Sequence, residues 1–131
     1  MGEFEAIAAL FAPLTRGAPG AFGLTDDAAL LNAPGDLVIT ADALVEGVHF
    51  LRDDPLESVG WKLAAVNVSD LTAKGARPLA AILTLCWPQE RPLSQAAAFA
   101  HGLGAALDRL GSGCPLMGGD TTGTPGPLTV S

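Results

Sequence analysis

The sequence predicts a single α/β domain of the α+β type, and three observations support this fold class. Apolar residues make up 49% of the 131 positions, which is enough for one hydrophobic core. Three short runs rich in apolar and β-branched residues, at 37–41, 45–51 and 79–87, have the composition of strands. Two longer segments, 56–75 and 94–110, have the spacing and end signals of helices.

The N-terminal third alternates short elements with turns. Residues 3–14 have apolar side chains at helical spacing and two acids in the first turn, which predicts a short amphipathic helix. The Gly- and Pro-rich stretch 15–23 predicts a loop. The runs at 37–41 and 45–51 then predict two strands, separated by only three residues.

The segment 56–75 is the strongest helix prediction. Its apolar face is expected to carry Trp61, Ala64, Ala65, Val68 and Leu71, and its opposite face Asn67, Asp70 and Lys74. Gly75 is suited to cap the helix at its C-terminus, and Pro78 prevents its continuation.

The C-terminal half continues with a strand and a second helix. The uninterrupted apolar run 79–87 predicts a strand buried on both faces. Residues 94–110 predict a helix that begins at Ser94 and is closed by Gly111. A short strand at 115–117 is expected to lead into a glycine-rich loop at 118–123.

The charge balance excludes several classes of partner. Fourteen acidic residues outnumber seven basic ones, so the net charge is −7. Such a chain lacks the basic patch that would bind nucleic acid or an anionic membrane, and phosphate chemistry here would need metal ions. No segment has the length of a bilayer span and the N-terminus lacks a signal-peptide start, which predicts a cytoplasmic protein.

Several aspartates lie at the edges of apolar segments instead of on an exposed helix face. Asp26 and Asp27 precede a short apolar run, Asp42 follows the predicted strand 37–41, and Asp120 follows 115–117. Asp70 adds a carboxylate from the polar face of the central helix. Convergence of such oxygen ligands would suit Mg²⁺, which takes its remaining ligands from water and phosphate. The alternative is that each aspartate caps a turn or a helix start. We expect Asp42, Asp70 and Asp120 to meet in one acidic site.

The segment 118–122 (GGDTT) combines backbone freedom, a carboxylate and two hydroxyls, which suits phosphate and Mg²⁺ together, although an ordinary turn would use the same residues. Neither the P-loop motif nor the dinucleotide-binding glycine pattern occurs. His49 is a candidate donor to a substrate phosphate, or else a hydrogen-bonded structural histidine. Cys86 is expected in the core, and Cys114 has no base beside it that would make it a nucleophile.

A set of short motifs makes the sequence similar to a known family. They are 26–30 (DDAAL), 40–42 (TAD), 45–50 (VEGVHF), 65–71 (AVNVSDL), 74–78 (KGARP) and 118–122 (GGDTT). In this order they resemble the N-terminal domain of the thiamine-monophosphate kinases, within the superfamily of aminoimidazole ribonucleotide synthetase and selenophosphate synthetase. The segment 47–50 (GVHF) is the part that indicates the thiamine enzymes.

The resemblance implies a fold and an activity. The fold is a mixed β-sheet flanked by helices, as in the N-terminal domain of aminoimidazole ribonucleotide synthetase, and it pairs with its copy in a homodimer. The activity is ATP- and Mg²⁺-dependent phosphorylation of thiamine monophosphate to thiamine diphosphate, with ADP as product. Position by position, the resemblance gives as metal ligands Asp27, Thr40, Asp42, Asp70 and Asp120. It places Gly119 and Asp120 in the ATP site and makes His49 a contact to the substrate.

Residues 1–131 are therefore expected to form an N-terminal ATP- and Mg²⁺-binding and dimerisation domain, with a C-terminal domain absent from this chain. The last residues, 127–131, have the composition of half a strand. The strand candidates are apolar enough to leave an unburied face in a monomer, which also predicts a homodimer through the sheet. The alternatives are another ATP-dependent member of the superfamily, of the selenophosphate synthetase or hydrogenase-maturation type, and an inactive nucleotide-binding or dimerisation module.

Overall fold

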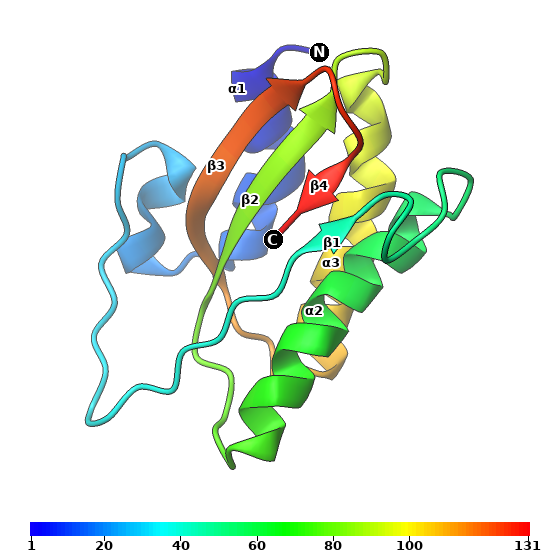
Figure 1. The fold of residues 1–131 in the computed structure, drawn as a ribbon. Helices are drawn as coiled ribbons and strands as arrows, with labels where there is room; N and C mark the ends of the chain where they lie inside the picture. Colours follow the sequence, from blue (N-terminus) through cyan, green and yellow to red (C-terminus); the bar gives the residue numbers. More distant parts are fainter.

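A mixed four-stranded sheet forms the centre of the computed structural model, which describes residues 1–131 (Figure 1). The strand order is β1-β4-β2-β3, with β1 at Leu44–Val45, β2 at Ala81–Pro88, β3 at Leu116–Thr124 and β4 at Thr129–Val130. The strands β2 and β3 run parallel, whereas β4 is antiparallel to both β1 and β2. The predicted fold class, a mixed sheet flanked by helices, is confirmed.

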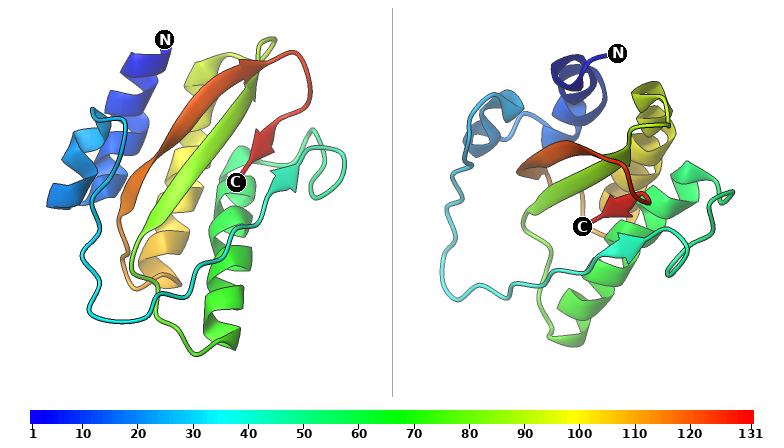
Figure 2. Two further views of the ribbon diagram at one scale, coloured as in Figure 1. Left: turned by 60° about the vertical axis from the view of Figure 1, so that its left-hand side comes forward. Right: turned by 45° about the horizontal axis from the view of Figure 1, so that its top comes forward.

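Two long helices, α2 (Leu56–Ala73) and α3 (Ala96–Arg109), contribute to the core together with the sheet. Four short helical pieces precede them in the chain, and η4 (Leu93–Gln95) leads into α3. In the views of Figure 2, α3 and the N-terminal helical turns lie on one side of the sheet and the coil 25–43 loops round the other side. No helix combines the length and apolar composition needed to span a bilayer.

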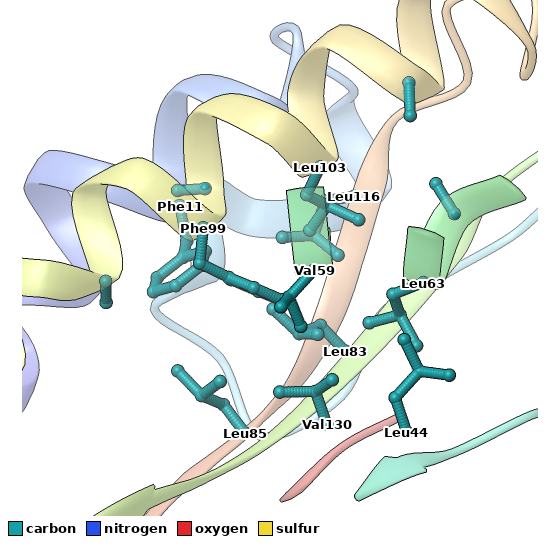
Figure 3. Packing of buried hydrophobic residues seen from close by; sticks show 14 of the residues in the cluster. Phe11, Leu44, Val59, Leu63, Leu83, Leu85, Phe99, Leu103, Leu116 and Val130 are labelled. Carbon is teal, nitrogen blue, oxygen red and sulfur yellow. The ribbon is translucent and has the colours of Figure 1, made fainter. Parts of the chain in front are cut away.

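The core lies between the two long helices and the inner face of the sheet (Figure 3). Its labelled members in that view are Phe11, Leu44, Val59, Leu63, Leu83, Leu85, Phe99, Leu103, Leu116 and Val130. On β2 the burial alternates along the strand, so that Leu83 and Leu85 point inward while Ile82 is 74% exposed. The prediction that 79–87 is buried on both faces is therefore wrong for this chain, because no layer covers the outer face.

The helices α2 and α3 approach each other closely at two glycines. A Cβ atom on Gly60 would lie 2.1 Å from the carbonyl oxygen of Phe99, and one on Gly102 would lie 1.9 Å from that of Glu57. Because the helices meet at these glycines, the side of α2 that faces α3 is the buried one, and it carries Val59, Gly60, Leu63 and Ala64. Of the apolar face predicted from spacing only Ala64 is buried, because a glycine adds nothing to a hydrophobic pattern yet allows the tightest helix contact.

The helix ends agree in part with the predictions. Gly75 has φ +70° and its N–H donates to the Thr72 carbonyl at 2.9 Å, so it closes α2 as expected. The second helix begins at Ala96 instead of Ser94, because residues 93–95 form a 3₁₀ turn without a side-chain cap. At the other end α3 stops at Arg109, one residue before the predicted last residue, Leu110.

The N-terminal helical span is present, but it changes its winding twice. The α-turn Glu3–Ala6 passes into a π-helical turn, η1 (Ile7–Phe11), and then into a 3₁₀ turn, η2 (Ala12–Thr15). The predicted loop 15–23 contains a further 3₁₀ piece, η3 (Pro19–Leu24), in which Phe22 and Gly23 have left-handed backbone angles.

One predicted strand is absent and another is shorter than predicted. Residues 37–41 form no strand and pair with nothing, and Leu37, Val38 and Ile39 are 46–84% exposed. A β-branched run favours extended backbone, whereas a strand also needs a neighbour to accept its hydrogen bonds, and this chain supplies none there. The predicted strand 45–51 is reduced to β1, because residues 46–49 turn back on themselves. The predicted loop 118–123 instead continues β3, since β2 offers a parallel partner along its whole length.

Candidate functional site

The coil before β1 contacts the exposed polar face of α2 at two points. The hydroxyl of Thr40 donates to Asp70 Oδ2 at 3.4 Å, and the backbone N–H of Asp42 donates to Asn67 Oδ1 at 3.0 Å. Asn67 and Asp70 are three residues apart on the helix, so they share one face. The helix thereby places residues of two separate motifs, 40–42 and 65–71, side by side.

Asn67 has a defined orientation and acts on the backbone of Asp42. Its Nδ2 donates to the carbonyl of Leu63 one turn earlier at 2.9 Å, which leaves Oδ1 to accept from Asp42. The carboxylate of Asp42 is left free and exposed. The helical spacing predicts only a polar-face position for Asn67, although an asparagine inside a helix, where it has low propensity, is a signal for a side-chain role.

A second set of contacts connects Asp42 to the sheet. The hydroxyl of Ser131 donates to the Asp42 carbonyl at 3.3 Å. The backbone of Ser131 exchanges two hydrogen bonds with Thr84 on β2, at 2.9 Å and 2.7 Å, and Thr84 is in turn the register partner of Asp120 on β3. Thr84 is exposed between two buried leucines, and register partners project from the same face. Asp120 is therefore connected to Asp42 through the backbones of Thr84 and Ser131, and this set of contacts is here called the row.

The row is not a preassembled metal cage. No group of three acidic, histidine or cysteine side chains in the chain is close enough to hold a metal ion by itself. The carboxylates of Asp42, Asp70 and Asp120 are nevertheless exposed, and none forms an ion pair with a Lys or Arg. An all-oxygen donor set of this kind fits Mg²⁺, which commonly uses one or two carboxylates together with waters and phosphate oxygens.

Asp27 is not joined to this row. It lies in the exposed coil 25–43, and its side chain makes no hydrogen bond. Two residues before Asp27, the hydroxyl of Thr25 donates to the Phe22 carbonyl at 2.8 Å. The backbone N–H of Leu30 donates to the Gly20 carbonyl at 2.9 Å, which closes the segment 20–30 at its base.

Gly119 lies within β3, directly against β2. Its φ is +147°, and a Cβ atom there would lie 1.7 Å from the carbonyl oxygen of Leu83. Only glycine fits this position. The next residue, Asp120, therefore lies on a part of β3 whose backbone is in close contact with β2.

A groove of about 410 Å³ lies at the carboxyl ends of the parallel strands β2 and β3. Its lining includes Thr121 and Thr122 of the GGDTT segment, together with Trp87 and Arg91. The volume falls within the range of small-molecule sites, and the carboxyl ends of parallel strands are a common location for them. Gly119 and Asp120 lie outside this lining.

His49 lies in the turn after β1 and has one defined ring contact. The backbone N–H of Val45 donates to its Nδ1 at 2.9 Å, and Lys62 Nζ donates to its backbone carbonyl. Because Nδ1 accepts a hydrogen bond, the proton of the neutral ring is on Nε2, which is free to donate from an exposed side chain. No hydrogen bond links His49 to the row of aspartates.

Cys114 and His101 have no hydrogen bond to the site residues described above. Cys114 is buried, and burial raises the pKa of its thiol, which disfavours the thiolate that a nucleophile or a metal ligand would need. His101 is exposed on α3 and lies 3.1 Å from Glu57. Both cysteines are free, and Cys86 is only partly buried, so the prediction that it lies in the core is wrong.

Comparison with known proteins gives a match over most of the chain. The family described as AIR synthase related protein, N-terminal domain, matches residues 25–131. A relative from Caulobacter vibrioides, named thiamine-monophosphate kinase, is 49% identical over 98% of this chain, and a relative of the same name from Synechococcus elongatus is 43% identical over 76%. The chain spans 37% and 31% of the lengths of these two relatives.

Solved structures give the same result. The thiamine-monophosphate kinase of Stenotrophomonas maltophilia K279a is 40% identical and superimposes with a TM-score of 0.74, over 93% of this chain and 40% of its own length. A structure described as AaThiL complexed with AMPPCP and TMP is 36% identical with a TM-score of 0.63, over 68% of this chain and 28% of its own. A hydrogenase maturation protein, HypE, reaches 0.78 at 21% identity over 99% of this chain and 38% of its own length, which shows a shared fold only.

Proposed function

Because the chain belongs to the AIR synthase related protein N-terminal domain family, we propose that it is the N-terminal half of a thiamine-monophosphate kinase. The reaction transfers the γ-phosphoryl group of ATP to the phosphate of thiamine monophosphate, giving thiamine diphosphate and ADP. Relatives of that name and the complex of AaThiL with AMPPCP and TMP support this assignment. The observation that carries it is the row of contacts joining the motifs 40–42, 65–71 and 118–122.

The proposed cofactor is Mg²⁺, with a set of oxygen ligands contributed by Asp27, Thr40, Asp42, Asp70 and Asp120. The support is the chemistry of the donors, since every one offers a hard oxygen and the carboxylates of Asp42, Asp70 and Asp120 carry no protein counter-ion. When bound, Mg²⁺ would neutralise the negative charge of the phosphates. Asp27 would join the set only if the coil 25–43 moves toward the row.

The residues of this chain would act by holding and orienting the reactants. Gly119 and Asp120 are proposed to contact ATP, where the missing side chain at 119 lets backbone approach a phosphate. Asn67 fixes the backbone of Asp42, and His49 Nε2–H is directed outward to donate to the substrate phosphate. A terminal oxygen of thiamine monophosphate attacks the γ-phosphorus while the bond to the β-phosphate oxygen breaks, without a covalent enzyme intermediate.

Replacement of His49 by Ala is expected to raise the KM for thiamine monophosphate and leave the Mg²⁺ dependence unchanged. Loss of one hydrogen bond to a charged group costs about 1.5–3 kcal/mol, or roughly 10- to 150-fold in kcat/KM. Steady-state kinetics with either substrate varied would measure this. His101→Ala is the matched control, since His101 contacts only Glu57. Unaltered kinetics toward thiamine monophosphate, or a defect confined to metal binding, would contradict the assignment of His49.

A homodimer through the outer side of the sheet is part of the proposal. Ile39 and Ile82 are 84% and 74% exposed, and the segment 37–41 has no strand beside it. A second copy could supply both the apolar cover and the missing hydrogen-bond partners. Size-exclusion chromatography with light scattering at micromolar concentration is expected to give twice the mass of one chain for the wild type. The Ile82→Lys variant is expected to give the mass of a single chain. A monomer for both proteins would rule out this interface.

The test of the proposed function compares this chain with a protein whose reading frame extends beyond Ser131. Formation of thiamine diphosphate and ADP by the longer protein, from ATP and thiamine monophosphate with Mg²⁺, is the expected result. Nucleotide binding without turnover in both proteins would favour the binding-module alternative. The cytoplasm is the proposed location, supported by the two free cysteines.

A further inference from the structure

The residues 46–52 form a closed turn, here called the His49 loop, whose two ends are Glu46 and Arg52. Inside it the N–H of Gly47 donates to the Phe50 carbonyl at 2.8 Å, and the N–H of His49 donates to the Val45 carbonyl at 2.9 Å. At its first end the N–H of Glu46 donates to the Leu128 carbonyl at 2.9 Å. These bonds set the path of the backbone but do not tie the two ends together.

One side chain from a distant segment contacts both ends. Arg91, in the turn after β2, directs Nη2 to Glu46 Oε2 at 3.2 Å and to the Arg52 carbonyl at 3.5 Å. The position of Arg91 is itself fixed, because the indole N–H of Trp87 donates to its backbone carbonyl at 2.8 Å. Trp87 is a buried residue of β2, so the sheet holds the guanidinium that bridges the loop.

The pair Arg91–Glu46 is shielded from water, which makes it different from the other ion pairs of the chain. The side chains of Arg91 and Glu46 are 13% and 10% exposed, whereas those of Arg52 and Glu90 in the neighbouring pair are 65% and 66% exposed. Exposed pairs contribute little, but removal of one member of a buried pair leaves an uncompensated charge. Both contacts of Arg91 come from one nitrogen, Nη2, whose two N–H groups can serve two acceptors.

We propose that Arg91 is a positioning residue for His49. By holding both ends of the His49 loop, it keeps the Val45 N–H in line with His49 Nδ1 and so keeps the Nε2–H directed outward. Arg91 acts through the loop, from a position that also lines the groove at the ends of β2 and β3. The effect on substrate binding rests on the proposed function, whereas the effect on the ring does not.

The first experiment measures the ring directly, by long-range ¹H–¹⁵N NMR of the 131-residue chain. The expected result for the wild type is a single neutral tautomer with an unprotonated Nδ1, and for Arg91→Gln an average over both tautomers. Arg109→Gln is the matched control, because Arg109 is exposed and makes no side-chain hydrogen bond. An Arg91→Gln spectrum in which His49 keeps the wild-type tautomer would overturn the proposal.

The second experiment addresses the case in which Arg91→Gln unfolds because Glu46 is left as an unpaired buried charge. The double variant Glu46→Gln with Arg91→Gln leaves no lone charge, yet it still lacks the contact to the Arg52 carbonyl. In the protein extended beyond Ser131, it is expected to raise the KM for thiamine monophosphate about tenfold, with kcat and the KM for ATP unchanged. A wild-type KM in the folded double variant would overturn the proposal. If the wild-type protein does not phosphorylate thiamine monophosphate, the proposed function fails, and the NMR result still decides the role of Arg91.

Discussion

In the protein extended beyond Ser131, replacement of Asp42 by Asn is expected to lower the kcat of the proposed kinase reaction about 10³-fold, with little change in the free energy of unfolding. The loss follows from removal of one carboxylate from the centre of the proposed Mg²⁺ site, where charge stabilisation supplies several kcal/mol of the rate enhancement. The fold should survive, because the contacts of Asp42 to Asn67 and Ser131 use its backbone N–H and carbonyl. The exposed carboxylate itself has no partner in the chain.

The measurement is a titration of activity with Mg²⁺ for the wild type and two variants. Asp36→Asn is the matched control, since Asp36 lies in the same coil, is exposed, and loses the same charge. The Asp42→Asn protein is expected to need a higher Mg²⁺ concentration for half of its residual activity, and Asp36→Asn to match the wild type. A fall of less than tenfold for Asp42→Asn, with unchanged Mg²⁺ dependence, would exclude Asp42 from the metal site.

Features set by near neighbours could be predicted from the sequence. The helix α2 ends where Gly75 and Pro78 indicate, because capping depends on the few residues at the end of a helix. The buried side of α2 could not be predicted in the same way, since it depends on where α3 packs. Gly60 and Gly102 bring the two backbones together, and their small size has no weight in a hydrophobic pattern.

The predicted strand 37–41 is wrong because strand pairing depends on residues that are distant in sequence. Its residues have the intrinsic preference for extended backbone, but in the structure they form no strand. Pairing requires a second strand, and nothing within residues 1–131 occupies that position. A composition typical of strands therefore does not show whether a pairing partner is present, which is why this segment is central to the dimer proposal.

The residues of the candidate site also differ in whether a local pattern could predict them. The aspartates are predictable because each lies in a short motif beside small residues. Asn67 and Arg91 are not, because their roles arise from contacts across 25 and 45 residues of sequence. A contact between segments that are distant in sequence does not identify its partner in a local pattern, even where a residue such as Asn67 is unusual in its helix. The partners become known only when the fold has brought the two segments together.

Gly119→Ala is expected to destabilise the chain by about 3 kcal/mol or more, which would lower the melting temperature by about 10 °C. Two effects add. The backbone at Gly119 has φ +147°, which an alanine rarely adopts, and the new Cβ would lie 1.7 Å from the carbonyl oxygen of Leu83. The obstructing atom belongs to the backbone of β2, so no rotamer change can relieve the clash, and the parallel pair β2–β3 must separate locally.

The neighbouring glycine provides the matched control for this prediction. A Cβ on Gly118 would meet only the Ala29 side chain, at 3.9 Å, which is an ordinary van der Waals contact. Gly118→Ala should therefore change the free energy of unfolding by no more than about 0.5 kcal/mol. Urea unfolding of both variants separates a steric requirement at one position from a general need for glycine in the GGDTT segment. Equal stability of the two variants would mean that β3 does not lie against β2 at Leu83 as described, and the row that joins Asp120 to Asp42 would lose its basis.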